Sequence, residues 1–289
     1  MKRRYLVPLD GSELAEDALP WAQLLAETLG GQVELLRCCE TLASVYMMPE
    51  FAAPSGAYYD QTAMNQQIDE YLDALAQRLP EGLTKKTRCE GDPGTAILAR
   101  AEAEEVDAIV LASHGRGGIG RWLLGSTTTK VVRGGQKPVL VISPTDEDAL
   151  NPKVRKILLP LDGSPTSEGV VKKGVELASA FQAELIFYRC VSHTPLGNPA
   201  LDAAVKLELA KAQDYLDEIR ARHPEINAST KVEIAGVSAG ILSQAEKCDL
   251  VLLSSHGRSG FKRWLLGSVA EKVIQSATKP IMVVYKKAE

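Results

Sequence analysis

A glycine-rich stretch occurs twice in this chain and decides how it is organised. Residues 113–126 read SHGRGGIGRWLLGS and residues 255–268 read SHGRSGFKRWLLGS, so the two copies differ at three of fourteen positions. Each copy follows a short apolar run and ends in Gly-Ser before another apolar segment. This pattern predicts a strand, a glycine-rich loop and the start of a helix. Because such a loop presents backbone N–H groups beside a helix N-terminus, we expect a phosphate group near each copy.

The repeat extends over the whole chain. Residues 5–12, YLVPLDGS, return at 157–164 as ILLPLDGS with an offset of 152, whereas the glycine loops are offset by 142. The first repeat is therefore ten residues longer, and we expect the extra length at 41–63. Repeats of this length are typical of single domains. We predict one domain at residues 1–145 and a second at 153–289, with a polar linker around 143–154.

Strands and helices alternate within each repeat. The first repeat is predicted to have strands at 4–9, 33–38, 84–89, 108–111 and 138–142, with helices at 14–29, 68–79, 95–105 and from 126. The second repeat is predicted to have strands at 157–161, 184–190, 230–234, 250–253 and 281–285, with helices from 164, at 203–222 and at 240–246. Ser12 is expected to cap the first helix and Pro20 to kink it. Lys172 stands at the matching position of the second repeat, so we expect that the fold does not need the kink.

This alternation predicts an α/β fold. Long helical crossovers between strands require parallel sheets covered by helices on both faces. Right-handed crossovers make each domain doubly wound, most simply as a five-stranded, flavodoxin-like sheet of order 3-2-1-4-5. Ligands of such sheets bind beyond the carboxyl ends of the strands where the order reverses, here between strands one and four. The two most repeated segments, residues 8–11 and the loop from 112, lie on either side of that crevice.

Composition narrows the class of protein. The chain is 45% hydrophobic and 24% charged, as in ordinary globular proteins, and its net charge of -4 argues against nucleic acid as the main partner. No apolar run reaches the length of a membrane helix, so we expect a cytoplasmic protein without a membrane partner. The five cysteines show neither a CxxC pair nor a metal-ligand spacing with histidine, and we expect reduced, buried thiols. They are Cys38, Cys39, Cys89, Cys190 and Cys248.

The glycine loops could hold a phosphate from both ends. Nine residues separate Gly115 from Gly125, and the hydroxyl residue Ser126 follows at the helix start. Gly257, Gly267 and Ser268 repeat this arrangement. Glycines let the backbone approach a phosphate chain closely, while the serine hydroxyl and the helix N–H groups donate to it. The alternative is a tight strand-to-helix connection in which the serine is an ordinary N-cap.

These residues resemble the universal stress proteins, and the resemblance covers essentially the whole chain as a tandem pair. Nucleotide-binding members of that family carry G-x2-G-x9-G-[S/T]; here the second and third glycines and the serine match in both repeats, whereas Ala112 and Ser254 replace the first glycine. The resemblance implies domains of the adenine nucleotide alpha hydrolase-like type with ATP, ADP or AMP in the crevice. It also implies a base pocket from Pro8, Leu9, Asp10 and Cys38, repeated by Pro160, Leu161, Asp162 and Cys190.

The remaining predicted nucleotide-binding residues lie along the two loops. In the first repeat they are Ala112, Ser113, Gly115, Arg116, Gly118, Gly125, Ser126 and Thr127. In the second they are Ser254, Ser255, Gly257, Arg258, Gly260, Gly267, Ser268 and Val269. Arg116 and Arg258 could neutralise phosphate charge, or be solvated surface residues. Asp10 and Asp162 could reach the base, the ribose or a Mg²⁺ ion through water; alternatively they shape the turn before the helix.

The function that we predict is a nucleotide-dependent regulator in a stress response, with no catalytic residues. Neither repeat shows a nucleophile, base and orienting group together, and the Walker lysine motif GxxxxGK[ST] does not occur. Two alternatives stay open: a slow Mg²⁺-dependent ATPase or phosphotransferase, and an interaction scaffold without nucleotide. Members of this family tend to pair through the last strand. Residues 139–142 and 281–284 are thus expected to pair within one chain as a pseudo-dimer, or between chains as a homodimer.

Overall fold

The computed structural model describes residues 3–39, 61–103, 106–113, 124–143, 150–192, 199–255 and 266–285. The chain divides after Val139 into two compact units. Unit one denotes the first repeat, including its last strand at 139–142, and unit two denotes the second repeat. Most of the predicted insertion at 41–63 and the central residues of both glycine loops, 114–123 and 256–265, lie outside the described ranges. Within those ranges, none of the helices combines the length and apolar character that a membrane crossing requires.

Unit one has the predicted strand order, β3-β2-β1-β4-β5, and the pairs β1–β2, β2–β3 and β1–β4 run parallel. Its strands are β1 (Arg4–Leu9), β2 (Gln32–Cys39), β3 (Thr84–Glu90), β4 (Val106–Ala112) and β5 (Val139–Ile142). Its helices are α1 (Glu13–Glu16), α2 (Ala18–Leu29), α4 (Gln61–Ala76), α5 (Pro93–Ala103) and α6 (Ser126–Gly134). The doubly wound prediction is therefore confirmed here, with helix α4 beginning earlier than predicted.

Unit two repeats this topology in the order β8-β7-β6-β9-β10, again with parallel pairs. Its strands are β6 (Lys156–Pro160), β7 (Glu184–Val191), β8 (Ala228–Ile234), β9 (Leu250–Ser254) and β10 (Ile281–Val284). Its helices are α7 (Pro165–Glu168), α8 (Val171–Phe181), α9 (Pro199–Ala221), α10 (Val237–Ala245) and α11 (Ser268–Ser276). In both units the carboxyl ends of the central strands lie where the sequence places the crevice.

The first helix of each unit is interrupted near its start, which corrects the prediction about Pro20. The Ser12 hydroxyl caps α1 by accepting from the Ala15 N–H at 3.2 Å, as predicted. The helix then breaks at Asp17 in unit one and at residues 169–170 in unit two. Asp17 and Gly169 adopt the same conformation, with ψ of -17° and -18°. The interruption belongs to the repeated fold, because unit two has it without a proline.

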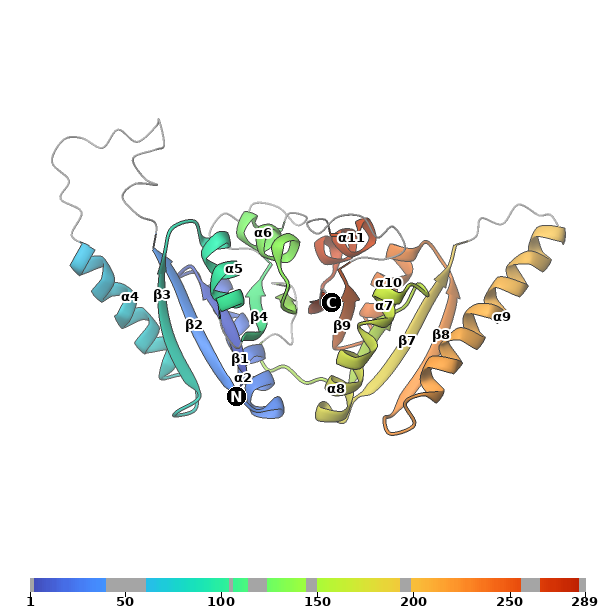
Figure 1. The fold of residues 1–289 in the computed structure, drawn as a ribbon, viewed down its shortest axis with the longest axis horizontal. Helices are drawn as coiled ribbons and strands as arrows, with labels where there is room; N and C mark the ends of the chain where they lie inside the picture. The colour runs from blue at the N-terminus through green and yellow to red at the C-terminus, as the bar shows by residue number, and fades with distance from the viewer. Residues whose placement is uncertain are drawn as a thin grey trace, which may run out of the picture. The chain divides into compact units, whose positions relative to one another are not determined.

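Helices cover both faces of each sheet. In unit one, α2 packs on β1, β2 and β4 and α4 packs on β2 and β3, while α5 packs against α6. Figure 1 shows α4 on one side of β3, with α5 and α6 on the other. The strands between these layers are apolar on both faces; Leu6, Val7, Ile109 and Val110 have no exposed surface. This burial is expected of parallel strands with helices on both faces. The helices leave the carboxyl ends of the strands uncovered.

Candidate functional site

A cavity of about 550 Å³ opens at the carboxyl ends of β6, β7 and β9 in unit two. This is the crevice at the reversal of strand order, as the topology predicts. Nine of the twelve nucleotide-binding residues predicted in unit two line it: Pro160, Leu161, Asp162, Cys190, Ser254, Ser255, Gly267, Ser268 and Val269. Gly257, Arg258 and Gly260 lie outside the described residues. The sequence therefore identified residues that are distant along the chain and adjacent in space.

Each glycine loop is closed at its base by a backbone hydrogen bond. The Gly125 N–H donates to the Ser113 carbonyl at 2.9 Å, and the Gly267 N–H donates to the Ser255 carbonyl at 2.8 Å. The closure brings the end of β4 or β9 beside the start of the next helix. Gly115, Arg116 and Gly118 of the first loop fall outside the described residues.

The helices begin at Ser126, as predicted, and at the matching Ser268, which excludes the alternative in which the serine is the N-cap. Gly125 and Gly267 occupy the N-cap positions, so Ser126 and Ser268 are the first helical residues and not caps. Neither N-cap makes a side-chain hydrogen bond to its helix. Ser126 and Ser268 are exposed, and Thr127 follows in the same first turn. The first-turn N–H groups of α6 and α11 therefore lack a capping side chain within the described part of the chain, as is common where a helix binds an anion.

Asp10 and Asp162 shape the turns that precede α1 and α7. Oδ1 of each carboxylate accepts from the backbone N–H of the serine two residues later, at 2.9 Å in both units. The intervening glycines, Gly11 and Gly163, have φ of 80° and 83°, a conformation that favours glycine. The turn-forming role that the sequence left open for these aspartates is thus present. No group of three His, Cys, Asp or Glu side chains that could hold a metal occurs among the described residues.

Cys38 departs from its predicted state. The structure joins Cys38 and Cys89 in a disulfide, so the expectation of five reduced thiols is wrong for this pair. Cys38 and Cys89 face each other in the register of the parallel strands β2 and β3, with their Cα atoms 4.6 Å apart. The sequence held a signal for it: each cysteine ends a predicted strand, and the predicted order makes those two strands neighbours. Cys39 and Cys248 are free and buried, as expected.

The corresponding strands of unit two carry a hydrogen-bonded network that sequence reasoning missed. The fully buried Tyr188 lines the cavity and donates its hydroxyl to the Glu233 carboxylate at 2.9 Å. The Cys190 thiol lies 3.1 Å from the same hydroxyl. Gln244 donates to both carboxylate oxygens of Glu233 at 3.0 Å, and Lys231 lies 2.9 Å from it. Tyr188 reads as an ordinary core residue in an apolar strand, so its partners become visible only in the fold.

Electrostatics set the protonation states of this network. Burial raises the pKa of Tyr188 above its usual range, and burial also raises the pKa of the Cys190 thiol. The hydrogen bond from Lys231 lowers the pKa of Glu233. At neutral pH the tyrosine is therefore a donor and the glutamate a charged acceptor. The Cys190 sulfur faces the cavity as a neutral thiol.

An arginine near the end of the second strand of each unit lies over a tyrosine ring. Arg189 lines the cavity and places its guanidinium 4.9 Å from the centre of the Tyr215 ring. The Tyr215 hydroxyl in turn donates to Glu168 at 3.1 Å. In unit one, Arg37 lies 5.9 Å from the Tyr71 ring and donates to the Leu9 carbonyl at 3.1 Å. The cation–π contact holds the positive charge of each arginine in place. The sequence signal for this feature was the Arg-Cys pair near the end of the second strand in both repeats.

In unit one the predicted residues hold the corresponding positions. Pro8 and Leu9 end β1, and Ala112 ends β4. The buried Thr128 of α6 donates its hydroxyl to the Ala112 carbonyl at 3.0 Å. The small residue that replaces the family's first glycine is thereby joined to helix α6.

The chain belongs to the universal stress protein family, whose model matches residues 1–143 and 153–285. A universal stress protein of Mycolicibacterium smegmatis is 29% identical over 284 residues, which cover 96% of both chains. A universal stress protein of Mycobacterium tuberculosis is 32% identical over 185 residues, covering 63% of this chain and 62% of its own. The crystal structure of a universal stress protein from Archaeoglobus fulgidus has a TM-score of 0.68 and 20% identity, covering 99% of this chain and 96% of that chain. The last likeness concerns the fold.

Proposed function

We propose that this protein is a nucleotide-dependent regulator that binds ATP, or its products ADP and AMP, in the crevices of its two units. The observation that carries the proposal is the cavity of unit two, around which the fold gathers nine predicted nucleotide-binding residues. Its volume of about 550 Å³ lies within the range of roughly 300–1,000 Å³ that is usual for small-molecule sites. A cytoplasmic role in a stress response is part of the same proposal.

The two ends of this cavity carry groups that suit the two ends of a nucleotide, its phosphates and its base. The phosphates would lie at the first turn of α11, where Gly267 and Ser268 present backbone donors and the helix dipole favours an anion. The base would lie between Leu161 and Cys190, and the guanidinium of Arg189 supplies a fixed positive charge nearby. Mg²⁺ would enter with the phosphates through water beside Asp10 and Asp162.

We propose regulation in preference to catalysis. A bound nucleotide stabilises the conformation for which it has the higher affinity, and a partner can recognise that conformation without any chemical step. The enzymatic alternative requires a base or a metal-bound water at the terminal phosphate. Sustained phosphate release from Mg-ATP by the wild-type protein, lost in a Gly125→Val, Gly267→Val variant, would replace this proposal with an ATPase.

The last strands are proposed to pair, which would make one chain a pseudo-dimer. β5 reads VLVI and β10 reads IMVV, and pairing protects such apolar edges from other chains. Light scattering coupled to size exclusion should then give the mass of a single 31.2 kDa chain. A mass twice as large would instead support the homodimer.

Binding is tested by calorimetry and thermal shift with Mg-ATP on the wild-type chain. Gly267→Val places a branched side chain at the N-cap of α11 and should abolish binding in unit two; Gly125→Val is the matched change in unit one. Ala221→Val, an exposed change at the far end of α9, is the control for fold and should leave binding intact. If the wild-type protein gives neither heat nor a thermal shift, the nucleotide proposal fails and the scaffold alternative takes its place.

A further inference from the structure

We propose that Cys38 and Cys89 form a reversible redox site that makes ligand binding in unit one, and not in unit two, depend on the thiol–disulfide state. This inference rests on the proposed nucleotide binding in the crevice of unit one. It adds a form of regulation that the proposed function does not contain, because oxidation would change the ligand affinity of unit one and leave that of unit two unchanged.

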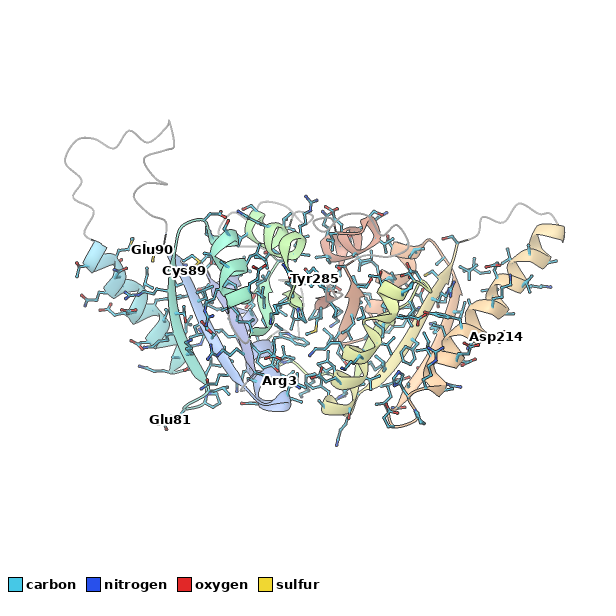
Figure 2. The ribbon with its side chains drawn as sticks, in the orientation of Figure 1. Arg3, Glu81, Cys89, Glu90, Asp214 and Tyr285 are labelled. Carbon is cyan, nitrogen blue, oxygen red and sulfur yellow. A yellow bond between two sulfur atoms is a disulfide. The ribbon has the colours of Figure 1, made fainter. Side chains whose placement is uncertain are left out.

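The disulfide lies where a reductant can reach it. Cys89 is the second-last residue of β3, the edge strand of unit one, and Cys38 is opposite it on β2. Figure 2 shows Cys89 at the end of β3, beside Glu90. Both cysteines are half-buried, so the sulfur atoms are neither sealed in the core nor fully solvated. Thiol–disulfide exchange needs this access.

The repeat connects the same disulfide to the crevice. Cys38 corresponds to Cys190 by the offset of 152, and Cys190 lines the cavity of unit two. The Cys190 sulfur lies 3.1 Å from the Tyr188 hydroxyl and 3.8 Å from the Val237 carbonyl at the start of α10. In unit one the bond to Cys89 directs the corresponding sulfur toward β3. Reduction frees the Cys38 thiol to take the position that Cys190 occupies in the lining of the cavity.

Unit two lacks the second cysteine. Glu233 stands opposite Cys190 in the register of β7 and β8, where unit one has Cys89 opposite Cys38. The remaining thiols are poor nucleophiles, since burial raises the pKa of Cys39, and raises that of Cys248 to about 11. The free cysteines are Cys39, Cys190 and Cys248. Disulfide chemistry is therefore restricted to the Cys38–Cys89 pair.

The chemical step is an exchange with a low-molecular-weight dithiol. A thiolate of the dithiol attacks one sulfur of the Cys38–Cys89 bond and forms a mixed disulfide, releasing the other cysteine as a thiolate that takes up a proton. The second thiol of the reductant then displaces the remaining cysteine, which also leaves as a thiol. The dithiol has become a cyclic disulfide, and two electrons and two protons have passed to the protein. The reverse reaction, with the cyclic disulfide as oxidant, restores the bond.

The test uses the full chain with Gly267→Val, so that only unit one binds Mg-ATP. The protein is equilibrated with oxidised or reduced dithiothreitol, its free thiols are counted under denaturing conditions, and Mg-ATP affinity is measured by calorimetry. We expect three titratable thiols of the five after oxidation and five after reduction. Affinity should rise about threefold to tenfold on reduction, the size expected for one added ligand contact.

Two further variants isolate the cause. Cys89→Ser in the same background should bind with the affinity of the reduced form in both conditions, and circular dichroism checks its fold. Cys190→Ser in that background should keep the redox dependence, because its sulfur belongs to unit two. Binding that is measurable but equal in the two redox states overturns this inference alone, as does a count of five thiols after oxidation. Binding absent from both states while the wild-type chain still binds removes the proposed nucleotide site of unit one, and this inference with it.

Discussion

The two units share a strand order and an aspartate-containing turn, but the crevice floor, formed by the carboxyl halves of two adjacent strands, differs between them. In unit one the floor is Leu36 together with the Cys38–Cys89 disulfide on β2 and β3. In unit two the matching positions hold Tyr188, Cys190 and Glu233, which are joined by hydrogen bonds. The comparison shows that a duplicated backbone can keep its crevice while the chemistry beneath it changes.

The changes at the floor occur in compensating pairs. Aligning TAIL of unit one (residues 95–98) with AGIL of unit two (residues 239–242) matches Ala96 with Gly240. A Cβ added to Gly240 would lie 2.6 Å from both the Tyr188 hydroxyl oxygen and the Cys190 sulfur. Unit one has the smaller Leu36 in place of Tyr188, which leaves room for the Cβ of Ala96 on the helix. A larger residue on the strand is therefore matched by a smaller one on the helix.

A second difference lies deeper in the same layer. In unit one Glu34 is completely buried and accepts two hydrogen bonds of 2.7 Å from the Arg100 guanidinium and one of 2.6 Å from Thr87. Unit two has Ile186 and Gln244 at the positions of Glu34 and Arg100, so the buried ion pair is absent from that position. Gln244 binds Glu233 instead. The Arg100 guanidinium thus joins α5 to its sheet through an ion pair, whereas the Gln244 amide joins α10 to its sheet through hydrogen bonds.

The largest expected effect comes from breaking the ion pair of unit one. Arg100→Gln leaves a buried carboxylate without its bidentate partner and should destabilise unit one by about 3–5 kcal/mol. Gln244→Ala, the corresponding change in unit two, should cost only about 1 kcal/mol. Hydrogen exchange resolved by unit is the appropriate measurement, since a chain of two units need not unfold in one step.

The double variant Glu34→Ile, Arg100→Gln sharpens this result because it recreates the residues of unit two. It should recover most of the lost stability, since replacing a buried pair by matched groups is often nearly neutral. A cost below about 1 kcal/mol for Arg100→Gln alone would show that the remaining partners suffice for Glu34: Thr87, and Arg4 and Lys85, each 4.0 Å from it.

Reduction of the disulfide should be the next largest effect. The bond closes a separation of 51 residues, and its loss should destabilise unit one by about 2–4 kcal/mol through the greater entropy of the unfolded chain. Unit two should be unaffected. Hydrogen exchange with and without dithiothreitol measures both units in one sample. Cys89→Ser should show the same loss without any further response to the reductant; an equal loss in both units would mean that the stabilisation is not local to the bond.

These differences between the units show how much of the fold and of the site the sequence could predict. The strand order and the crevice followed from periodicity, crossover length and the repeated segments, because parallel strands must align their carboxyl ends. The disulfide depended on register, which links Cys38 to a residue 51 positions away. Tyr188 was missed for a related reason: a tyrosine in an apolar strand gives no sign of which acceptor its hydroxyl meets. The helix break is recognised as part of the repeated fold only by comparing Asp17 with Gly169, since the sequence suggests Pro20 as its cause and unit two has the break without a proline.

Adding a methyl group at Gly240 tests the compensating pair. Gly240→Ala must displace Tyr188 or Cys190 and should destabilise unit two by about 1–3 kcal/mol, although alanine favours helices intrinsically. Adding Tyr188→Leu, which recreates the floor of unit one, should restore part of that loss. The measurement is a double-mutant cycle. If the two changes add without interaction, the pair is not coupled and the match between Ala96 and Leu36 is coincidental.

The smallest effect concerns an ion pair that only unit one has at the crevice end of α5. Asp92 accepts from Lys130, and from the Thr95 hydroxyl at 2.6 Å; unit two has Gly236 in its place. The Lys130 hydrogen bond, followed by those from Thr95, lowers the pKa of Asp92 from 3.8 to about 2. Its folded pKa is depressed, so its stabilisation is present above about pH 4 and is lost as the pH falls through about 2.

Solvent limits the size of this contribution. More than half of the Asp92 side chain is exposed, so Asp92→Asn should destabilise unit one by less than about 1 kcal/mol at neutral pH, and by less still in high salt. The difference between variant and wild type should shrink as the pH falls through about 2 and vanish only below it, where the wild-type carboxyl is fully protonated. Titration of the Asp92 carboxyl by NMR measures the pKa directly. An ordinary value near 3.8 would show that Lys130 does not hold α6 to the start of α5, leaving the two units alike at this end of the crevice.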